Sequence, residues 1–428
     1  MRLTDELTHA EWTYRIPEGE IRRLLKYRVT YYFGGGLPGA LPTEKLATIV
    51  RDLGQSLLDQ VARGEEEAVC CLFNYAKTSG MDSLRELLMQ RLVERQGLHF
   101  DPATDFHKML ITAGSQQSLY AILDVTINPG DYILSAAPSY LGFVTPANKL
   151  GGRVVLCPSD QQGLTVEGVE EAIAAIKREA GVAPKLLYII ADSDNPKGTT
   201  LPADRRRALF DIAEREDILI VEDAAYKEIQ FGQERLAPIK TFDADNTRVA
   251  YLASTSKEAG VLRLGYAIFP EPIREQVEKA KGFYDLCCPS LTQKIAEHYY
   301  RLDMDAILTD VLARYRRRCA TMVESIDQFF PEGLHTRPTG GFFVWWEAPS
   351  GVPFDSKRFN EEIAIPNDIL FVPSHAFYPP EGFSVDDRGH LVSTPPRTNG
   401  MRLSFSAVPK AVIREGIEKL GTLLKRHL

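Results

Sequence analysis

Short apolar runs alternate with longer amphipathic segments between about residue 80 and residue 310. Apolar runs that end at Gly, Pro, Ser or an acidic residue predict buried strands, and apolar residues spaced three and four positions apart predict helices between them. Apolar strands separated by helices are typical of a mainly parallel sheet with helices on both faces. The predicted strands are residues 109–113, 132–138, 153–158, 186–192, 218–223 and 248–254.

Outside this central part the pattern differs. Towards the N-terminus it predicts a short helix at residues 16–26, a strand at 29–33 and an amphipathic helix at 43–62. Towards the C-terminus it predicts a strand at 340–349 and a final amphipathic helix at 410–424. A strand-rich segment closed by a helix indicates a second, smaller α+β domain.

A Pro- and Gly-rich stretch at residues 378–400 is predicted to be a long loop. The whole pattern predicts an α/β fold in three parts. Residues 1–60 form an N-terminal arm and part of the small domain, residues 61–315 form the large domain, and residues 316–428 form the C-terminal small domain.

The composition excludes several classes of protein. The 428 residues include 50 Lys and Arg and 58 Asp and Glu, so the net charge is −8, which argues against a nucleic-acid binder. No apolar run approaches the roughly 18 residues of a membrane span. The first residues carry acids and no apolar segment of the kind found in a secretory signal. We therefore expect a cytoplasmic protein with neither nucleic acid nor membrane as a partner.

The cysteines and histidines predict neither disulfide bonds nor a metal site. The six cysteines form two adjacent pairs and two singles, a spacing that fits neither a disulfide framework nor a zinc site. Reduced thiols in a reducing compartment are the expectation. The eight histidines include no metal-binding motif, so we expect no metal site.

Polar and aromatic residues follow the predicted strands. In sheets of this kind the ligand binds at the carboxyl ends of the strands. A turn at Gly114-Ser115-Gln116 opens a helix after the first strand, where free backbone N–H groups suit a phosphate. The residues that follow the other strands are Tyr140, Asn195, Asp223, Tyr226, Ser254, Lys257 and Arg263.

This set of groups matches the needs of a phosphorylated aromatic aldehyde. A lysine amine forms a Schiff base with the aldehyde. An acid keeps the pyridine nitrogen protonated, so that the ring accepts electrons from the substrate. An aromatic side chain stacks on the ring, and an Asn and a Tyr hydrogen-bond its phenolic oxygen.

With these residues at the strand ends, the sequence resembles the fold-type I pyridoxal-phosphate (PLP) enzymes, and among them the class I/II aminotransferases. It is most similar to the branch of the 2-aminoadipate and kynurenine aminotransferases, and the similarity extends from about Ile21 to Leu420. The resemblance implies a large PLP-binding domain, whose mainly parallel sheet is sandwiched by helices, and a smaller α+β domain. The motifs are NPKG at 195–198, DAAY at 223–226, STSKEAGVLR at 254–263 and RLSF at 402–405.

The resemblance implies roles around the cofactor. Lys257 forms the internal aldimine and moves the proton, Asp223 pairs with the pyridine N–H, and Tyr226 holds the phenolic oxygen together with Asn195. Tyr140 stacks on the ring. The phosphate is bound by Ser115, Gln116, Ser254 and Arg263, and by Tyr75 of the neighbouring subunit in a homodimer with shared active sites.

The resemblance also implies a substrate site. The planar guanidinium of Arg402 is well shaped for the substrate α-carboxylate. Gly36 and Asn195 lie beside it in the substrate pocket. In the segment IRRLLK, Arg22, or alternatively Arg23, meets the side chain of acidic substrates.

The expected activity is transfer of an amino group between an L-amino acid and a 2-oxo acid, with 2-oxoglutarate as the expected acceptor. An alternative keeps PLP but changes the chemistry to elimination, replacement, decarboxylation, cyclisation or oxidation, because one fold supports many reactions. In the family the arginine usually follows the lysine by seven positions, with a Pro-Gly between them. In KEAGVLR the arginine follows by six positions and the proline is absent. A non-catalytic regulator is disfavoured, since about 30 residues before the core leave no room for a DNA-binding domain.

Overall fold

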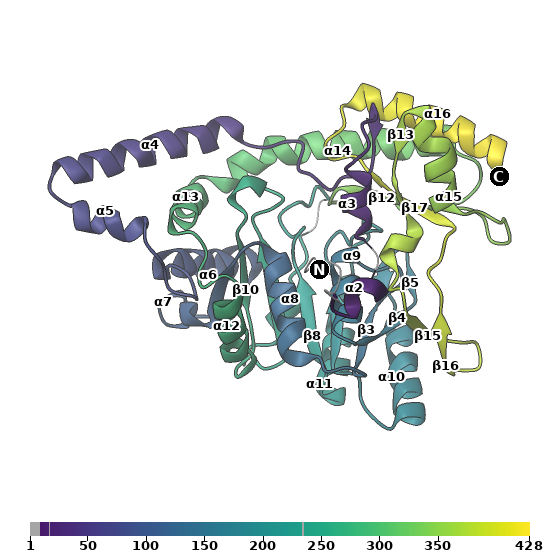
Figure 1. Ribbon diagram of the computed structural model, residues 1–428, viewed down its shortest axis with the longest axis horizontal. Coiled ribbons are helices and arrows are strands. Elements are labelled where there is room, and N and C mark those ends of the chain that lie inside the picture. Colours follow the sequence, from purple (N-terminus) through teal and green to yellow (C-terminus); the bar gives the residue numbers. More distant parts are fainter. Residues whose placement is uncertain (1–8, 17, 233–234) are drawn as a thin grey trace, which may run out of the picture.

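The computed structural model describes residues 9–16, 18–232 and 235–428. Its centre is a nine-stranded sheet, which is parallel from β15 to β9, whereas β16 and β10 run antiparallel to their neighbours (Figure 1). In spatial order the strands are β16 (Leu391–Thr394), β15 (Gly382–Val385), β4 (Arg153–Cys157), β3 (Tyr132–Ala136), β7 (Leu186–Ile189), β8 (Leu219–Asp223), β9 (Val249–Ser254), β10 (Gly265–Ile268) and β2 (Met109–Thr112).

Helices cover both faces of this sheet, which explains why its strands are apolar throughout. In β2, Leu110 belongs to the apolar cluster on one face, whereas Met109 and Ile111 belong to the cluster on the other. The first face carries α8 (Ser115–Thr126), α9 (Leu141–Lys149) and α12 (Ile273–Tyr284). The second carries α6 (Asp82–Gln96), α13 (Ser290–Tyr300), α10 (Val166–Ala180) and α11 (Ala203–Glu216).

A smaller antiparallel sheet lies beside the large one, in the order β11 (Leu334–His335), β12 (Phe343–Glu347), β17 (Gly400–Ser404) and β14 (Val372–Pro373). The long helix α14 (Met304–Phe329) packs against the C-terminal helix α16 (Lys410–His427). Near the N-terminus, β1 (Tyr31–Tyr32) pairs with β13 (Ile369–Leu370), so residues far apart in sequence share this part of the fold.

The proposed three-part division of the chain stays a prediction. Its second boundary, between residues 315 and 316, falls inside the continuous helix α14. Helices α4 (Thr43–Ala62) and α5 (Glu66–Leu72) project from the body of the molecule (Figure 1). None of the described helices is both long enough and apolar enough to cross a membrane. The remaining α-helices and strands of the described residues are α2 (Trp12–Arg15), α3 (Glu20–Leu24), α7 (Pro102–Asp105), α15 (Ser356–Phe359), β5 (Ser159–Asp160) and β6 (Gly163–Leu164).

The prediction of a long loop at residues 378–400 is wrong in its centre. Residues there form the hairpin β15–β16, and β15 extends the large sheet by pairing in parallel with β4. Phe383, Val385 and Leu391 pack against the apolar cluster beneath α10, and this burial favours the extended conformation. The prolines that flank the hairpin and the glycine at its turn, Gly389 with φ +81°, gave the stretch the composition of a loop.

Candidate active site

A cavity of about 230 Å³ lies at the carboxyl ends of the central strands, and its wall is completed by the small domain. The residues predicted at the strand ends line this cavity together with the predicted substrate residues Gly36 and Arg402. The strand-end residues are Ser115, Gln116, Tyr140, Asn195, Asp223, Tyr226, Ser254, Lys257 and Arg263. The structure therefore brings together groups that come from most of the length of the chain.

Lys257 lies in the turn after β9 with its side chain in the cavity. Its Nζ donates a hydrogen bond to the carbonyl of Gly36 at 3.3 Å and lies 5.0 Å from the centre of the Tyr226 ring. Burial, together with the nearby positive charge of Arg402, lowers the pKa of the Lys257 amine to about 8. About a tenth of the amine is therefore neutral, and so nucleophilic, at pH 7, against less than about a thousandth for an ordinary lysine.

Asp223 ends β8 on the floor of the same cavity. Its Oδ2 accepts a hydrogen bond from the hydroxyl of Tyr188 at 2.9 Å, and its Oδ1 accepts one from the backbone N–H of Ala225 at 3.2 Å. Burial raises the pKa of Asp223, and the hydrogen bond from Tyr188 opposes that shift. A cationic group of a ligand placed against this carboxylate would form an ion pair with it.

The start of α8 forms one end of the cavity. Gly114 precedes it with φ +78°, and a Cβ there would lie 2.8 Å from Nη2 of Arg263, so the turn requires a glycine. The N-terminal backbone N–H groups of a helix, a guanidinium and the hydroxyls of Ser254 and Ser256 together suit a phosphate.

The shortened connection after Lys257 still delivers Arg263 to this end. The chain makes one tight turn, η3 (Gly260–Leu262), and Arg263 adopts a left-handed backbone conformation with φ +49°. Its Nη1 donates a hydrogen bond to Oγ of Ser256 at 3.1 Å, and the backbone N–H of Ser256 donates to Oγ of Ser254 at 3.1 Å. The tight turn and the left-handed Arg263 thus bring the arginine side chain to the cavity although the connection is one residue shorter.

Arg402 is buried on β17 of the small sheet and lines the same cavity. Its guanidinium donates to Oδ1 of Asn195 and to the carbonyl of Gly34, both at 2.8 Å, and stacks 4.1 Å from the centre of the Phe343 ring. Its Nε has no hydrogen-bond partner among the described residues. A guanidinium carries five N–H donors, so it retains donors for a carboxylate that enters the cavity.

Tyr140 precedes α9 and is held by Gln116. The Tyr140 hydroxyl donates to Oε1 of Gln116 at 3.1 Å, and Nε2 of Gln116 donates to the carbonyl of Gly142 at 2.6 Å. Burial raises the pKa of Tyr140 to about 12, so its ring stays neutral. Such a ring can stack on a flat ligand in the cavity.

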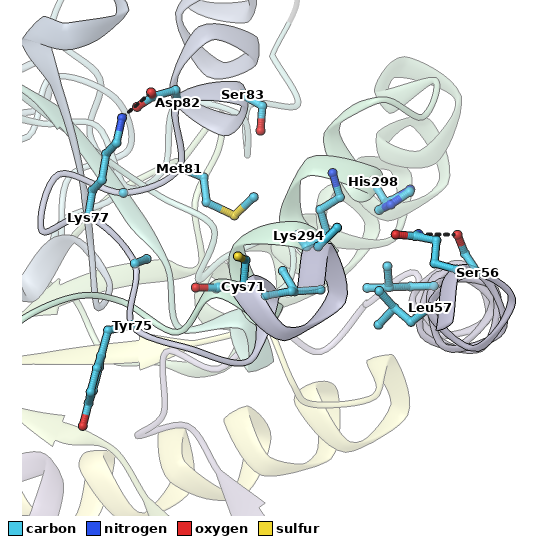
Figure 2. Close-up of a pocket in the computed structure, with 17 residues that line it drawn as sticks. Ser56, Leu57, Cys71, Tyr75, Lys77, Met81, Asp82, Ser83, Lys294 and His298 are labelled. Atoms are coloured by element: carbon cyan, nitrogen blue, oxygen red, sulfur yellow. Dashed lines mark hydrogen bonds and ion pairs between the residues drawn. The ribbon is translucent and has the colours of Figure 1, made fainter. Parts of the chain in front are cut away.

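Three predicted residues do not line this cavity: Arg22, its alternative Arg23, and Tyr75. Arg23 forms ion pairs with Glu20 and Glu361. The side chain of Arg22 is 83% exposed, and its Nε lies 3.3 Å from Glu18, whereas Ile21 of the same helix α3 does line the cavity. Tyr75 is 81% exposed and borders a different cavity of about 830 Å³ between α4, α5 and α13. Figure 2 shows its hydroxyl pointing away from the other labelled side chains.

Sequence reasoning missed other residues that contact or line the site. Tyr188 lies within the apolar strand β7 and Ile190 directly follows it, so their sequence context is that of hydrophobic core residues. Only the register of β7 beside β8 places the Tyr188 hydroxyl on Asp223. The further lining residues are Leu141, Ala225, Ser256 and Phe343. Ser256 stands in the motif with Lys257 and could have been found there.

This fold and site define a PLP-dependent enzyme, because the cavity offers a partner for each functional group of that cofactor. Lys257 suits the aldehyde, Asp223 the pyridine nitrogen and the start of α8 the phosphate. The chain belongs to the aminotransferases of class I and II, since residues 51–420 match that family.

Individual relatives and solved structures support this family membership. The chain is 31% identical over 417 residues to aromatic-amino-acid aminotransferase 1 of Thermococcus litoralis, which covers 96% of this chain and 92% of that protein. It is 30% identical to 2-aminoadipate transaminase of Thermus thermophilus over 96% of this chain and 95% of that protein. It superposes on kynurenine aminotransferase of Pyrococcus horikoshii, solved with PMP, with a TM-score of 0.85, 30% identity and coverage of 98% and 97%.

The cofactor is therefore PLP and the reaction is transamination. The other PLP chemistries considered from the sequence are not favoured, because these relatives are aminotransferases.

With Lys257 as the predicted PLP-binding lysine, its lowered pKa predicts how the capture of PLP by the apoprotein depends on pH. Only the neutral amine attacks an aldehyde, so the capture rate should rise with pH and level off above about pH 8. An ordinary lysine would give a midpoint near pH ~10.4. Stopped-flow absorbance of PLP mixed with apoprotein between about pH 6 and pH 10 measures the midpoint, and a value near that of a free lysine would contradict the assigned environment.

Proposed function

We propose that this aminotransferase exchanges the amino group of an L-amino acid with a 2-oxo acid, with 2-oxoglutarate as the acceptor. The observation that carries the proposal is the convergence of Lys257, Asp223 and Arg402 on one cavity. These residues supply a nucleophilic base, an anion for the cofactor ring and a cation for the substrate carboxylate. No two of these three residues are close in sequence, so it is the fold that brings them together.

The bound cofactor supplies an electron sink that makes the α-proton of the amino acid acidic. In the proposed mechanism Lys257 would hold the cofactor through its amine until the amino acid binds. With the amino acid bound, the amine of Lys257 would take up the α-proton as a base and give it back as an acid. Its lowered pKa suits this work, because a general base acts best when its pKa is close to the working pH.

Other residues hold the cofactor. Asp223 pairs with the protonated ring nitrogen, Tyr140 stacks on the ring, and Asn195 and Tyr226 bind the phenolic oxygen. All four line the cavity. The phosphate is assigned to Ser115, Gln116, Ser254 and Arg263, where a helix start and a guanidinium meet.

Arg402 orients the substrate through its α-carboxylate, and Gly36 and Asn195 form the neighbouring wall. Ile21, Leu141 and Phe343 line the cavity there as well. Arg22 remains our candidate for acidic side chains. Because it pairs with Glu18, it would have to leave that partner to reach the substrate. Comparing Arg22→Ala on glutamate and on leucine tests this role, since only the acidic substrate should lose activity.

The proposed assembly is a homodimer with shared active sites. The proposed location is the cytoplasm. Soluble monomers rarely expose large apolar patches, and here exposed apolar side chains gather on the projecting helices and on nearby segments. They are Val50, Leu58, Val61, Phe73, Tyr75, Phe283 and Leu286. A second copy of the chain that covers these residues would bring Tyr75 to the phosphate of its partner. The cytoplasmic location rests on the composition alone.

An absorbance spectrum of the purified holoenzyme tests the reaction. Anaerobic addition of an L-amino acid pool should replace the visible band of the bound cofactor by a near-ultraviolet band of the aminated cofactor, and 2-oxoglutarate should restore the first band. A persistent long-wavelength band, or a change only when air is admitted, would contradict transamination.

The shared site predicts complementation between two defective chains. Lys257→Ala and Tyr75→Ala subunits, mixed to form dimers, yield heterodimers in which one site has both Lys257 and an intact Tyr75. Random mixing in equal amounts should restore about a quarter of the wild-type activity. Activity no higher than the sum of the separate variants would show that Tyr75 does not act across subunits.

A further inference from the structure

We propose that Tyr188 is a positioning residue for Asp223, whose hydroxyl holds the carboxylate ionised and oriented toward the ring nitrogen of the cofactor. The inference rests on the proposed pairing of Asp223 with that nitrogen. It concerns a residue within a buried strand that the mechanism above does not use.

The contact between the two residues is specific. The Tyr188 hydroxyl donates to Oδ2 of Asp223 at 2.9 Å, whereas the backbone of Ala225 donates to Oδ1. Each carboxylate oxygen thus has one donor, which fixes the plane of the group and leaves lone pairs for the cofactor. Tyr188 is only 2% exposed, so water does not replace this donor.

The Tyr188 ring has little freedom to move. It stacks on Phe143 with 4.0 Å between ring centres and 6° between planes, and Phe143 is fully buried on α9. On its own strand, Tyr188 lies opposite Ser135 of β3 on one side and Val221 of β8 on the other. This packing holds the hydroxyl at one position, so its hydrogen bond does not depend on an ordering step at binding.

The electrostatics give the contact a role beyond packing. The ionised form of a buried carboxylate is disfavoured unless donors stabilise it. The pKa of Tyr188 itself is raised well above its usual value, so the hydroxyl remains a donor throughout the working pH range. The titratable groups that interact with Asp223 are Tyr140, Tyr188, Asp194, Tyr226 and Lys257, of which only Lys257 is a cation.

Tyr188→Phe removes the donor and keeps the ring. Tyr251→Phe is the matched control, because Tyr251 is also buried in this sheet, belongs to the cluster on the opposite face and donates one buried hydrogen bond, to Gln96. The primary readout is the affinity of each apoprotein for PLP between about pH 5.5 and pH 8.5, with the melting temperature measured alongside.

We expect Tyr188→Phe to weaken PLP binding by about tenfold near neutral pH, the effect of losing a hydrogen bond to a charged group. Without the donor the pKa of Asp223 rises, so the loss should grow as the pH falls and shrink as it rises. Tyr251→Phe should lower the melting temperature by a similar amount and leave PLP affinity within about twofold at every pH.

A second measurement separates coupling from damage to the fold. In an Asp223→Ala background, Tyr188→Phe should change PLP affinity by less than about twofold, because the partner of the hydroxyl is gone. Equal losses in both backgrounds, or equal effects of Tyr188→Phe and Tyr251→Phe on affinity, would overturn the proposal. If wild-type enzyme transaminates but Tyr188→Phe binds PLP normally, only this inference fails. A wild type that does not transaminate refutes the proposed function instead.

Discussion

Replacing Lys257 with alanine is expected to abolish transamination and to leave the fold intact. In the proposed mechanism the change removes the nucleophile that holds the cofactor and the base that moves the α-proton, so kcat should fall by at least about 10⁴-fold. The fold should survive because the Lys257 amine makes one hydrogen bond, at 3.3 Å, to the Gly36 carbonyl.

The stability of the apoprotein gives this prediction a second part. The pKa of Lys257 is lowered to about 8, so the folded state disfavours the charged amine. At pH 7, below both this pKa and that of a lysine in the unfolded chain, protonation opposes folding. The Lys257→Ala apoprotein should therefore melt at the same temperature as the wild type or higher. Calorimetry of the two apoproteins measures this difference.

Lys425→Ala is a suitable control, because Lys425 is exposed on the C-terminal helix. This variant should keep wild-type activity and stability. Residual turnover by Lys257→Ala near the wild-type rate would show that another group acts as the base, and the assignment of Lys257 would be wrong.

Replacing Arg402 with alanine is expected to lower kcat/KM by about 10²- to 10⁴-fold for every amino acid and oxo acid tested. In the proposed function the guanidinium gives the substrate α-carboxylate a pair of charge-assisted hydrogen bonds, each of which contributes about 1.5–3 kcal/mol. All substrates carry this carboxylate, so the loss should be uniform and should appear mainly as a higher KM. Steady-state kinetics with a panel of substrates measures it.

Arg402→Lys refines the test, since it keeps the charge and loses the planar fork. Its kcat/KM should lie between those of the wild type and Arg402→Ala. Arg402 also donates to Asn195 and to Gly34, so the PLP affinity of each variant has to be measured to correct for changes in cofactor binding. A loss confined to one substrate would contradict the carboxylate role and would assign Arg402 to side-chain recognition.

Amphipathic periodicity predicted the helices well. The helix at residues 43–62 has the predicted bounds in the structure, and the final helix extends only three residues beyond its prediction, to His427. The hairpin β15–β16 was missed, because its prolines and its glycine turn dominate the composition, whereas its burial against α10 depends on contacts distant in sequence. Local propensity does not contain that information.

The site shows the same division. The sequence by itself determined which groups follow each strand, and in an open parallel sheet all carboxyl ends face one edge, so Lys257, Asp223 and Asn195 could be placed together. Its motifs, in their order along the chain, indicated the family and the cofactor, whereas the comparison with known aminotransferases decided between transamination and other PLP chemistries. Only the tertiary structure decided the register of β7 against β8, which places the Tyr188 hydroxyl 2.9 Å from Asp223. Only the tertiary structure separated Ile21, in the cavity, from Arg22, in solvent, because the direction of a side chain on a short helix is set by the surface against which that helix packs.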